Sequence, residues 1–280
     1  MSYPTLLLPL DDDPRAGARL ALATRLAHGW RSHVIGLSCR RPAPAADDGP
    51  APLGGYDPLT LDLLRAREMA LEREQAFQRR CEAAGLASFE LRADADEPGR
   101  AVTRHARGGD LVLLGQPDPA DPECAAHRSV LEYVLLHNAR PSLVVPYAGH
   151  FEAPGRIVLL AWDDSRQAAR AAADALPLMR RAAAVHVVQF EHGPRVAADT
   201  DPPRLAPVVR WLAGHGIEAA PAFLHVPGDI GNALLSHAAD IDADLLVMGA
   251  WGMSRWAERM LGGTTRTVLA SMTMPVLMAH

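Results

Sequence analysis

The sequence predicts an α/β protein built from two tandem doubly wound domains, each a five-stranded parallel sheet with helices on both faces. Three observations lead to this fold class. Short apolar runs alternate with amphipathic stretches, the 280-residue chain repeats one pattern twice, and the hydrophobic fraction of 49% is enough to fill cores of that size. The predicted strands are apolar throughout, as expected of parallel strands that are buried on both faces.

The repeat is visible in two pairs of segments. Residues 110–115 resemble residues 244–249, and residues 140–145 resemble residues 274–279, both at an offset of 134 positions. Two matches in one register are the mark of a duplicated unit.

The beginnings of the halves fix the domain boundaries. The run Leu6–Asp11 resembles Val158–Asp163 at an offset of 152 positions, so the first half is longer by 18 residues. We assign the excess to a loop insertion over Arg40–Asp57, which is rich in Pro, Ala, Gly and Asp. The predicted domains are residues 1–148 and residues 155–280.

In the first half, the helix signals are spacing and capping. Ala23, Leu26, Ala27 and Trp30 follow the spacing of one helix face, and Asp57-Pro58 is typical of a helix start that Gly85 would end. The predicted elements, in order, are strand Thr5–Leu10, the helix through Trp30, strand Val34–Leu37, the helix from Pro58, strand Phe89–Leu91, helix Gly99–Arg107, strand Leu111–Leu114, helix Ala125–Asn138 and strand Leu143–Val145.

The second half repeats this order. We expect Pro177 to kink or shorten its first helix, because proline lacks the amide that the helix needs. The predicted elements are strand Ile157–Ala161, helix Ser165–Arg181, strand Val185–Gln189, helix Pro203–Ala213, strand Ala220–Leu224, helix Asp229–Ala239, strand Leu245–Met248, helix Thr265–Ser271 and strand Val276–Met278.

Composition excludes several classes of protein. A net charge of −5 argues against nucleic-acid binding. The sequence has no run of about 18–20 uncharged apolar residues, so it predicts no membrane span. The N-terminus lacks the pattern of a secretory signal, so we expect a cytoplasmic protein. Cys39, Cys81 and Cys124 are widely spaced, which favours reduced thiols over disulfides or a zinc site. The chain contains no lysine, which excludes a lysine Schiff base and a Walker A loop.

A glycine-rich segment follows the fourth strand of the second half. Gly249 and Gly252 lie at the strand-to-loop turn, and Gly262, Gly263 and Thr264 begin the next helix. Glycines let the backbone approach a ligand closely, and the unpaired amides at a helix N-terminus attract anions. Ligands of open parallel sheets bind beyond the carboxyl ends of the strands, where Asp163 would face the same crevice.

The spacing G-x2-G-x9-G after Asp-Leu-Leu-Val-Met-Gly resembles the nucleotide-binding signature of the universal stress protein family. The resemblance covers both halves and is strong only in the second. It implies an adenine nucleotide alpha hydrolase-like fold and an ATP site, with or without Mg²⁺, in the second domain only. The residues implied to line that site are Asp163, Val188, Gly249, Trp251, Gly252, Gly262, Gly263 and Thr264.

Two departures from the family pattern concern the phosphate end of the implied site. Gly263 stands where the family usually has Ser or Thr, which moves the hydroxyls along by one residue. Trp251 either stacks on a base or fills the phosphate pocket. The alternative to a nucleotide site is a glycine loop that is needed only for tight turns and packing.

The first half lacks most of the signature. Gly115 is followed by Pro117 and Asp118, which remove an amide donor and add a carboxylate where a phosphate would lie. Asp11-Asp12-Asp13 is either a cation site or a solvated loop with a helix cap, and we favour the loop. We therefore expect a degenerate first domain and no metal site.

The function that the sequence favours is a non-catalytic stress-response module that binds an adenine nucleotide. Two alternatives stay open: a nucleotide-free interaction protein of the same fold, and a weak ATPase. No catalytic residues are predicted. In the family the closing edge strands often pair subunits, so Ser142–Val145 and Val276–Met278 are expected to join the two domains as a pseudo-dimer within the chain, with or without a further homodimer.

Overall fold

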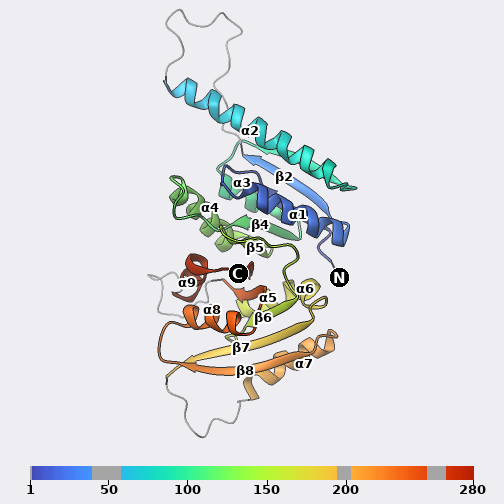
Figure 1. Cartoon of the computed structure of the whole chain (residues 1–280), viewed down its shortest axis with the longest axis vertical. Helices are drawn as coiled ribbons and strands as arrows, with labels where there is room; N and C mark the ends of the chain where they lie inside the picture. The colour runs from blue at the N-terminus through green and yellow to red at the C-terminus, as the bar shows by residue number, and fades with distance from the viewer. Residues whose placement is uncertain (1, 40–57, 194–202, 251–262) are drawn as a thin grey trace, which may run out of the picture.

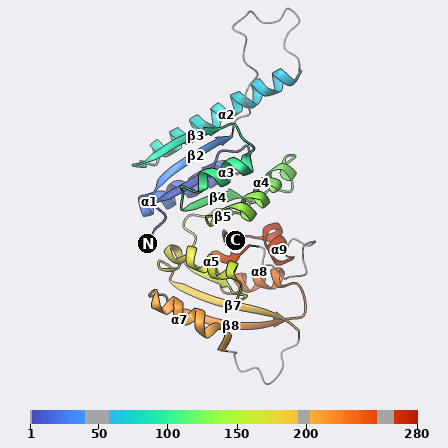
Figure 2. The ribbon, with the colours of Figure 1, turned by 180° about the vertical axis from the view of Figure 1, so that it is seen from behind.

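The computed structural model describes residues 2–39, 58–193, 203–250 and 263–280, which form one ten-stranded sheet with helices on both faces (Figures 1 and 2). The strand order is β3-β2-β1-β4-β5-β10-β9-β6-β7-β8. The predicted α/β class is confirmed, but the two five-stranded sheets are continuous with each other. The predicted insertion at 40–57 lies outside the described residues.

The first half runs from β1 to β5 and places its helices on both sides of the sheet. Its elements are β1 (Thr5–Pro9), α1 (Ala16–Trp30), β2 (His33–Cys39), α2 (Pro58–Ala83), β3 (Phe89–Asp94), α3 (Pro98–Ala106), β4 (Leu111–Gly115), α4 (Cys124–His137) and β5 (Ser142–Val145). Helices α1 and α2 pack on one face, whereas α3 and α4 pack on the other. All neighbouring strands within this half are parallel.

The second half repeats the arrangement from β6 to β10. Its elements are β6 (Ile157–Ala161), α5 (Arg166–Asp174), α6 (Leu176–Met179), β7 (Ala184–His192), the 3₁₀ turn η1 (Pro203–Leu205), α7 (Ala206–Gly214), β8 (Ala219–Val226), α8 (Ile230–Asp240), β9 (Leu245–Gly249), α9 (Gly263–Ser271) and β10 (Val276–Ala279). Helices α5, α6 and α7 share the face of α1, and α8 and α9 share the face of α3 and α4.

The two halves meet where β5 and β10 pair antiparallel, as the sequence predicts. Leu277 is opposite Leu143 and Val276 is opposite Val144, and all four side chains are fully buried. Away from the strands, the Tyr3 hydroxyl donates to the Asp174 carbonyl at 2.5 Å. One hydrophobic core on each face runs across this junction.

Matching hydrogen bonds show that the halves are structural copies. The carboxylate of Asp110 accepts from the Thr5 amide at 2.8 Å, and that of Asp244 accepts from the Ile157 amide at 2.8 Å. In both places an aspartate that precedes the fourth strand of its half orders the start of the first strand.

The helix signals read from the sequence are present locally. Ser165 is the N-cap of α5, with its hydroxyl accepting from the Ala168 amide at 3.1 Å. The predicted helix is broken at Ala175, two residues before Pro177, into α5 and α6. Gly85 has a φ of +63°, a left-handed conformation that glycine adopts without strain. Among the described residues, no helix is both long and apolar enough to cross a membrane.

Candidate functional site

A cavity opens at the carboxyl ends of β6, β7 and β9, which we call the second cleft. Its volume is about 220 Å³. The first turns of α8 and α9 close it from the side. Its lining residues are Ala161, Trp162, Asp163, Val188, Phe190, Ile230, Leu234, Met248, Gly249, Gly263, Thr264 and Thr265. The cleft therefore lies where ligands bind in open parallel sheets.

Five of the eight residues predicted for the nucleotide site line this one cavity: Asp163, Val188, Gly249, Gly263 and Thr264. They come from three strand ends and one helix start, which are separated by up to about a hundred residues in the chain. The other three, Trp251, Gly252 and Gly262, lie outside the described residues.

Asp163 is held in a tight turn between β6 and α5. Its Oδ1 accepts from the Ser165 amide at 3.1 Å and from the Ser165 hydroxyl at 2.5 Å. Asp164, between them, has a φ of +62°. The exposed Asp163 carboxylate is thereby fixed at the rim of the second cleft with its Oδ2 free of any partner among the described residues.

The structure explains the two described glycines of the motif in different ways. A Cβ on Gly249 would lie 2.7 Å from the Ala168 amide nitrogen, so the close packing of β9 against α5 requires glycine there. A Cβ on Gly263 would meet no described atom within 4 Å. Packing explains Gly249, whereas Gly263 leaves the first turn of α9 open toward the cleft.

The apolar wall of the second cleft includes residues that the sequence reasoning missed. Val188 and Phe190 are two positions apart on β7 and therefore face the same way, and Leu234 and Met248 complete the wall. The alternation along β7 was a signal that could have identified Phe190. Ile230 and Leu234 lie on α8, the helix that follows the third strand of this half. We had not expected this helix at the site.

The first half contains an equivalent cavity of about 340 Å³, which we call the first cleft. One backbone hydrogen bond recurs in both halves and aligns the two clefts. The Leu10 amide donates to the Leu37 carbonyl at 2.8 Å, and the Trp162 amide donates to the Val188 carbonyl at 2.8 Å. Leu37 and Gly115 thus occupy the places of Val188 and Gly249. The two halves therefore have clefts of similar position and different chemistry.

A buried arginine occupies the space beside Gly115. The Arg19 side chain is 1% exposed, and its guanidinium pairs with Asp11 and, at 2.7 Å, with Asp13. The expectation of a solvated aspartate loop is wrong for Asp13, which is buried against this arginine. A Cβ on Gly115 would collide with both Arg19 and Asp13.

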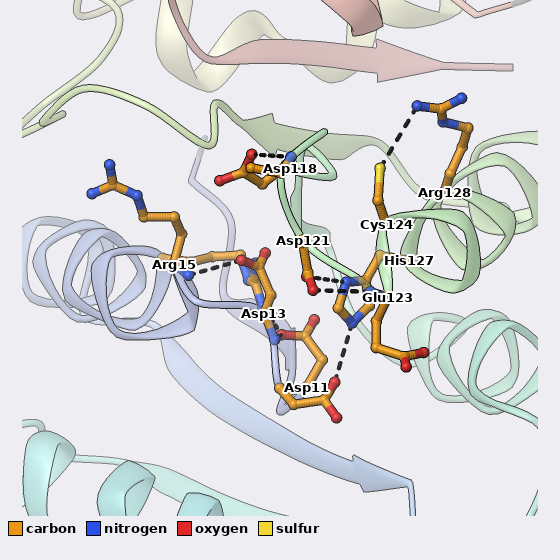
Figure 3. Close-up of polar contacts among 12 residues, drawn as sticks. Asp11, Asp13, Arg15, Asp118, Asp121, Glu123, Cys124, His127 and Arg128 are labelled. Atoms are coloured by element: carbon orange, nitrogen blue, oxygen red, sulfur yellow. Dashed lines mark hydrogen bonds and ion pairs between the residues drawn. The ribbon is translucent and has the colours of Figure 1, made fainter.

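Two loops of the first cleft are tied together by one histidine (Figure 3). His127 Nε2 contacts Asp12 Oδ1 at 3.1 Å, and Nδ1 contacts Asp121 Oδ2 at 3.1 Å. Asp118, which we expected in the cleft, instead accepts from the Ala120 amide at 2.9 Å within its own loop. No three His, Cys, Asp or Glu side chains in the described ranges form a metal site.

The His127 bridge predicts a pH-dependent stability. Burial lowers the pKa of His127, but the hydrogen bond to Asp12 and the nearby carboxylates outweigh it and raise the pKa above its usual value near 6.5. Protonated His127 therefore stabilises the fold fully below about pH 6.5, and this stabilisation is lost as the pH rises through the raised value. For His127→Gln, the free energy of unfolding measured in urea should fall short of the parent at pH 6 and approach it as the pH rises above the raised pKa of His127. A deficit that is constant with pH would contradict the prediction.

Comparisons with known proteins agree with this architecture. Residues 155–280 match the model of the universal stress protein family. A universal stress protein from Archaeoglobus fulgidus DSM 4304 superposes with a TM-score of 0.72 at 19% identity, covering 98% of this chain and 95% of that chain. A functionally unknown protein from Pseudomonas aeruginosa PAO1 gives a TM-score of 0.58 at 16% identity, covering 99% and 92%. No curated protein matched. Residues 155–280 therefore carry a domain of the universal stress protein family, and the whole chain shares the fold of the solved universal stress protein.

Proposed function

We propose that the second cleft binds an adenine nucleotide such as ATP and that the protein acts as a non-catalytic, nucleotide-responsive module in a stress response. The observation that carries the proposal is a single cavity that combines an apolar wall, a helix N-terminal turn and a fixed carboxylate. These three parts suit the three parts of a nucleotide: base, phosphates and ribose.

Each part of the cleft fits one chemical group. Val188, Phe190 and Met248 offer apolar surface to a flat base. The first turn of α9 presents Gly263 and the Thr264 hydroxyl, and helix N-termini favour phosphate. The Asp163 carboxylate can accept hydrogen bonds from ribose hydroxyls.

A magnesium ion in this proposal comes with the nucleotide. Within the described part of the chain, no group of His, Cys, Asp or Glu could hold a metal without it. The titration below is therefore made with ATP alone and with ATP and Mg²⁺.

The nucleotide-free interaction protein is a second candidate, and Gly249 favours it. Because packing against α5 already explains this glycine, part of the motif has a purely structural reason. The two candidates differ in whether Gly263, which packing does not explain, is needed for binding.

A thermal-shift titration tests the proposal. A ligand at about 100 times its Kd stabilises a protein by about 2.7 kcal/mol, which for a chain of this size raises Tm by about 5–10 °C. Gly263→Asp should abolish the shift, because it places a carboxylate where the phosphates bind. The same change is mildly stabilising for an empty helix start, so loss of the shift would not reflect unfolding.

A matched control is Gly17→Asp, in the first turn of α1, where a Cβ also meets no described atom within 4 Å. This variant should keep the full shift with ATP. The parent protein showing no shift, or Gly263→Asp showing the parent's shift, would refute the proposed site. ADP released on prolonged incubation, and lost in Gly263→Asp, would replace the non-catalytic role with the weak ATPase.

A further inference from the structure

We propose that the first cleft binds a small organic cation, an apolar molecule that carries a protonated amine, in place of a nucleotide. The cavity itself is the starting observation. Its volume of about 340 Å³ lies in the range of about 300–1,000 Å³ that is usual for ligand pockets.

The floor of the first cleft is apolar. Leu37, Val102 and Leu114 are at most 5% exposed and line the cavity, and Val130 and Leu131 of α4 form its side. Such a floor offers hydrophobic contact to an aliphatic or aromatic body. A fully polar ligand would leave this surface unused.

The rim is acidic. Four carboxylates, Asp11, Asp12, Asp13 and Glu123, line the cavity together with a single guanidinium, Arg73. Arg19 neutralises Asp11 and Asp13, and Asp12 is shared by Arg73 and His127. In the described part of the chain, Glu123 makes no ion pair.

Glu123 precedes α4 and lines the same cavity as Asp11 and Asp13 (Figure 3). Its exposed carboxylate is thus the uncommitted negative charge of the rim. A cation entering the cleft can pair with it at little desolvation cost, since the carboxylate already faces water.

A thiol within the cleft lies in the field of nearby carboxylates. Burial is the larger cause that raises the pKa of Cys39, and the charges of Asp94, Glu97, Asp11 and Asp96 raise it further, to about 12. The field of these carboxylates disfavours a phosphate and favours a cation.

The chemistry of the cleft also separates organic cations from metal ions. A divalent metal needs several convergent oxygen ligands, and the residues that the structure describes contain no such group. The apolar floor would be idle under a hydrated metal ion but would cover the body of an amine.

Three probes of nearly equal shape test the proposal by isothermal titration calorimetry. Tryptamine is cationic at pH 7, indole-3-ethanol is neutral and indole-3-acetate is anionic. Tryptamine should bind about two- to fivefold more tightly than the alcohol, because an ion pair with an exposed carboxylate is favourable but weak. The acetate should bind more weakly than the alcohol.

Two substitutions locate the binding. Glu123→Gln, at an exposed position, should bring tryptamine to the affinity of the alcohol. Cys39→Phe should weaken binding of all three probes, because it narrows the cavity with the residue that the second half carries at the equivalent position, Phe190. The matched control Asp163→Asn, in the second cleft, should leave all three affinities unchanged.

Several results would overturn the proposal: no binding of tryptamine, equal affinities for the three probes, or tryptamine binding that survives Glu123→Gln. Loss of tryptamine binding in Asp163→Asn would do the same, since it would place the amine in the second cleft. The outcome is independent of the ATP titration, because Gly263→Asp changes only the second cleft and should bind tryptamine like the parent.

Discussion

Replacing Arg19 with methionine should lower the free energy of unfolding by about 3–5 kcal/mol. The guanidinium is buried between Asp11 and Asp13, of which Asp13 is itself buried. Methionine keeps most of the apolar stem, so the loss comes from leaving a carboxylate in the interior without its counter-charge. Removing one partner of a buried ion pair lowers the free energy of unfolding by more than the intact pair adds to it, because the remaining charge stays desolvated.

Urea unfolding followed by circular dichroism measures this effect. Arg15→Met, at the exposed residue that immediately precedes α1, is the matched control and should change the unfolding free energy by at most about 0.5 kcal/mol. Adding Asp13→Asn to Arg19→Met should restore part of the loss, since it removes the unpaired charge. An Arg19→Met protein as stable as Arg15→Met would show that the cluster contributes no stability.

This cluster also shows why the first cleft was hard to predict. Three consecutive aspartates are usually a solvated loop, and Arg19 has the spacing of an ordinary helix residue. Only the fold brings the arginine under Gly115, where a side chain on that residue would collide with it. The contact depends on two strand ends meeting in space, which neither local sequence carries.

The fold itself could be predicted further than the site. The offset of 134 positions identified the fourth and fifth strands of both halves, and these strands place β5 beside β10. The pairing of these two strands, which makes the sheet continuous, was expected from the family resemblance and not from the pattern itself. Nothing local in Val276–Ala279 distinguishes a strand that ends one sheet from a strand that joins two.

At the second cleft, the sequence predicted the polar and glycine positions better than the apolar ones. Asp163 and Gly263 stand out because they interrupt the apolar pattern where a strand ends and a helix begins. Phe190 and Leu234 have the appearance of ordinary core residues, and only their position at the carboxyl edge of the sheet gives them a place in the cavity.

The two clefts share a backbone and differ in charge. In the second cleft a carboxylate at the rim faces a helix start with hydroxyls, whereas the first cleft has four carboxylates around an apolar floor. Our two proposals therefore assign an anion to the second cleft and a cation to the first. If both are occupied, the continuous cores beneath the sheet connect them physically.

Leu277→Asp should destabilise the protein by about 5 kcal/mol or more, because Leu277 lies at the centre of the junction between the halves. Its side chain is fully buried opposite Leu143, in a core that contains residues of both halves. Truncating a buried leucine costs about 2–5 kcal/mol, and burying a carboxylate without a partner adds several more. Since domains are stable by about 5–15 kcal/mol, much of this protein should be unfolded at room temperature.

The matched control is Leu64→Asp, the same change on α2 at a side chain that is 40% exposed, which should alter the urea midpoint little. Leu277→Ala, expected to cost about 2–5 kcal/mol, measures the packing contribution without the charge and keeps the test informative if the aspartate variant does not fold. Because the cores cross the junction, both halves should lose structure in one transition. A Leu277→Asp midpoint equal to that of Leu64→Asp would mean that the β5–β10 pairing does not hold the halves together, and that each half keeps a core of its own.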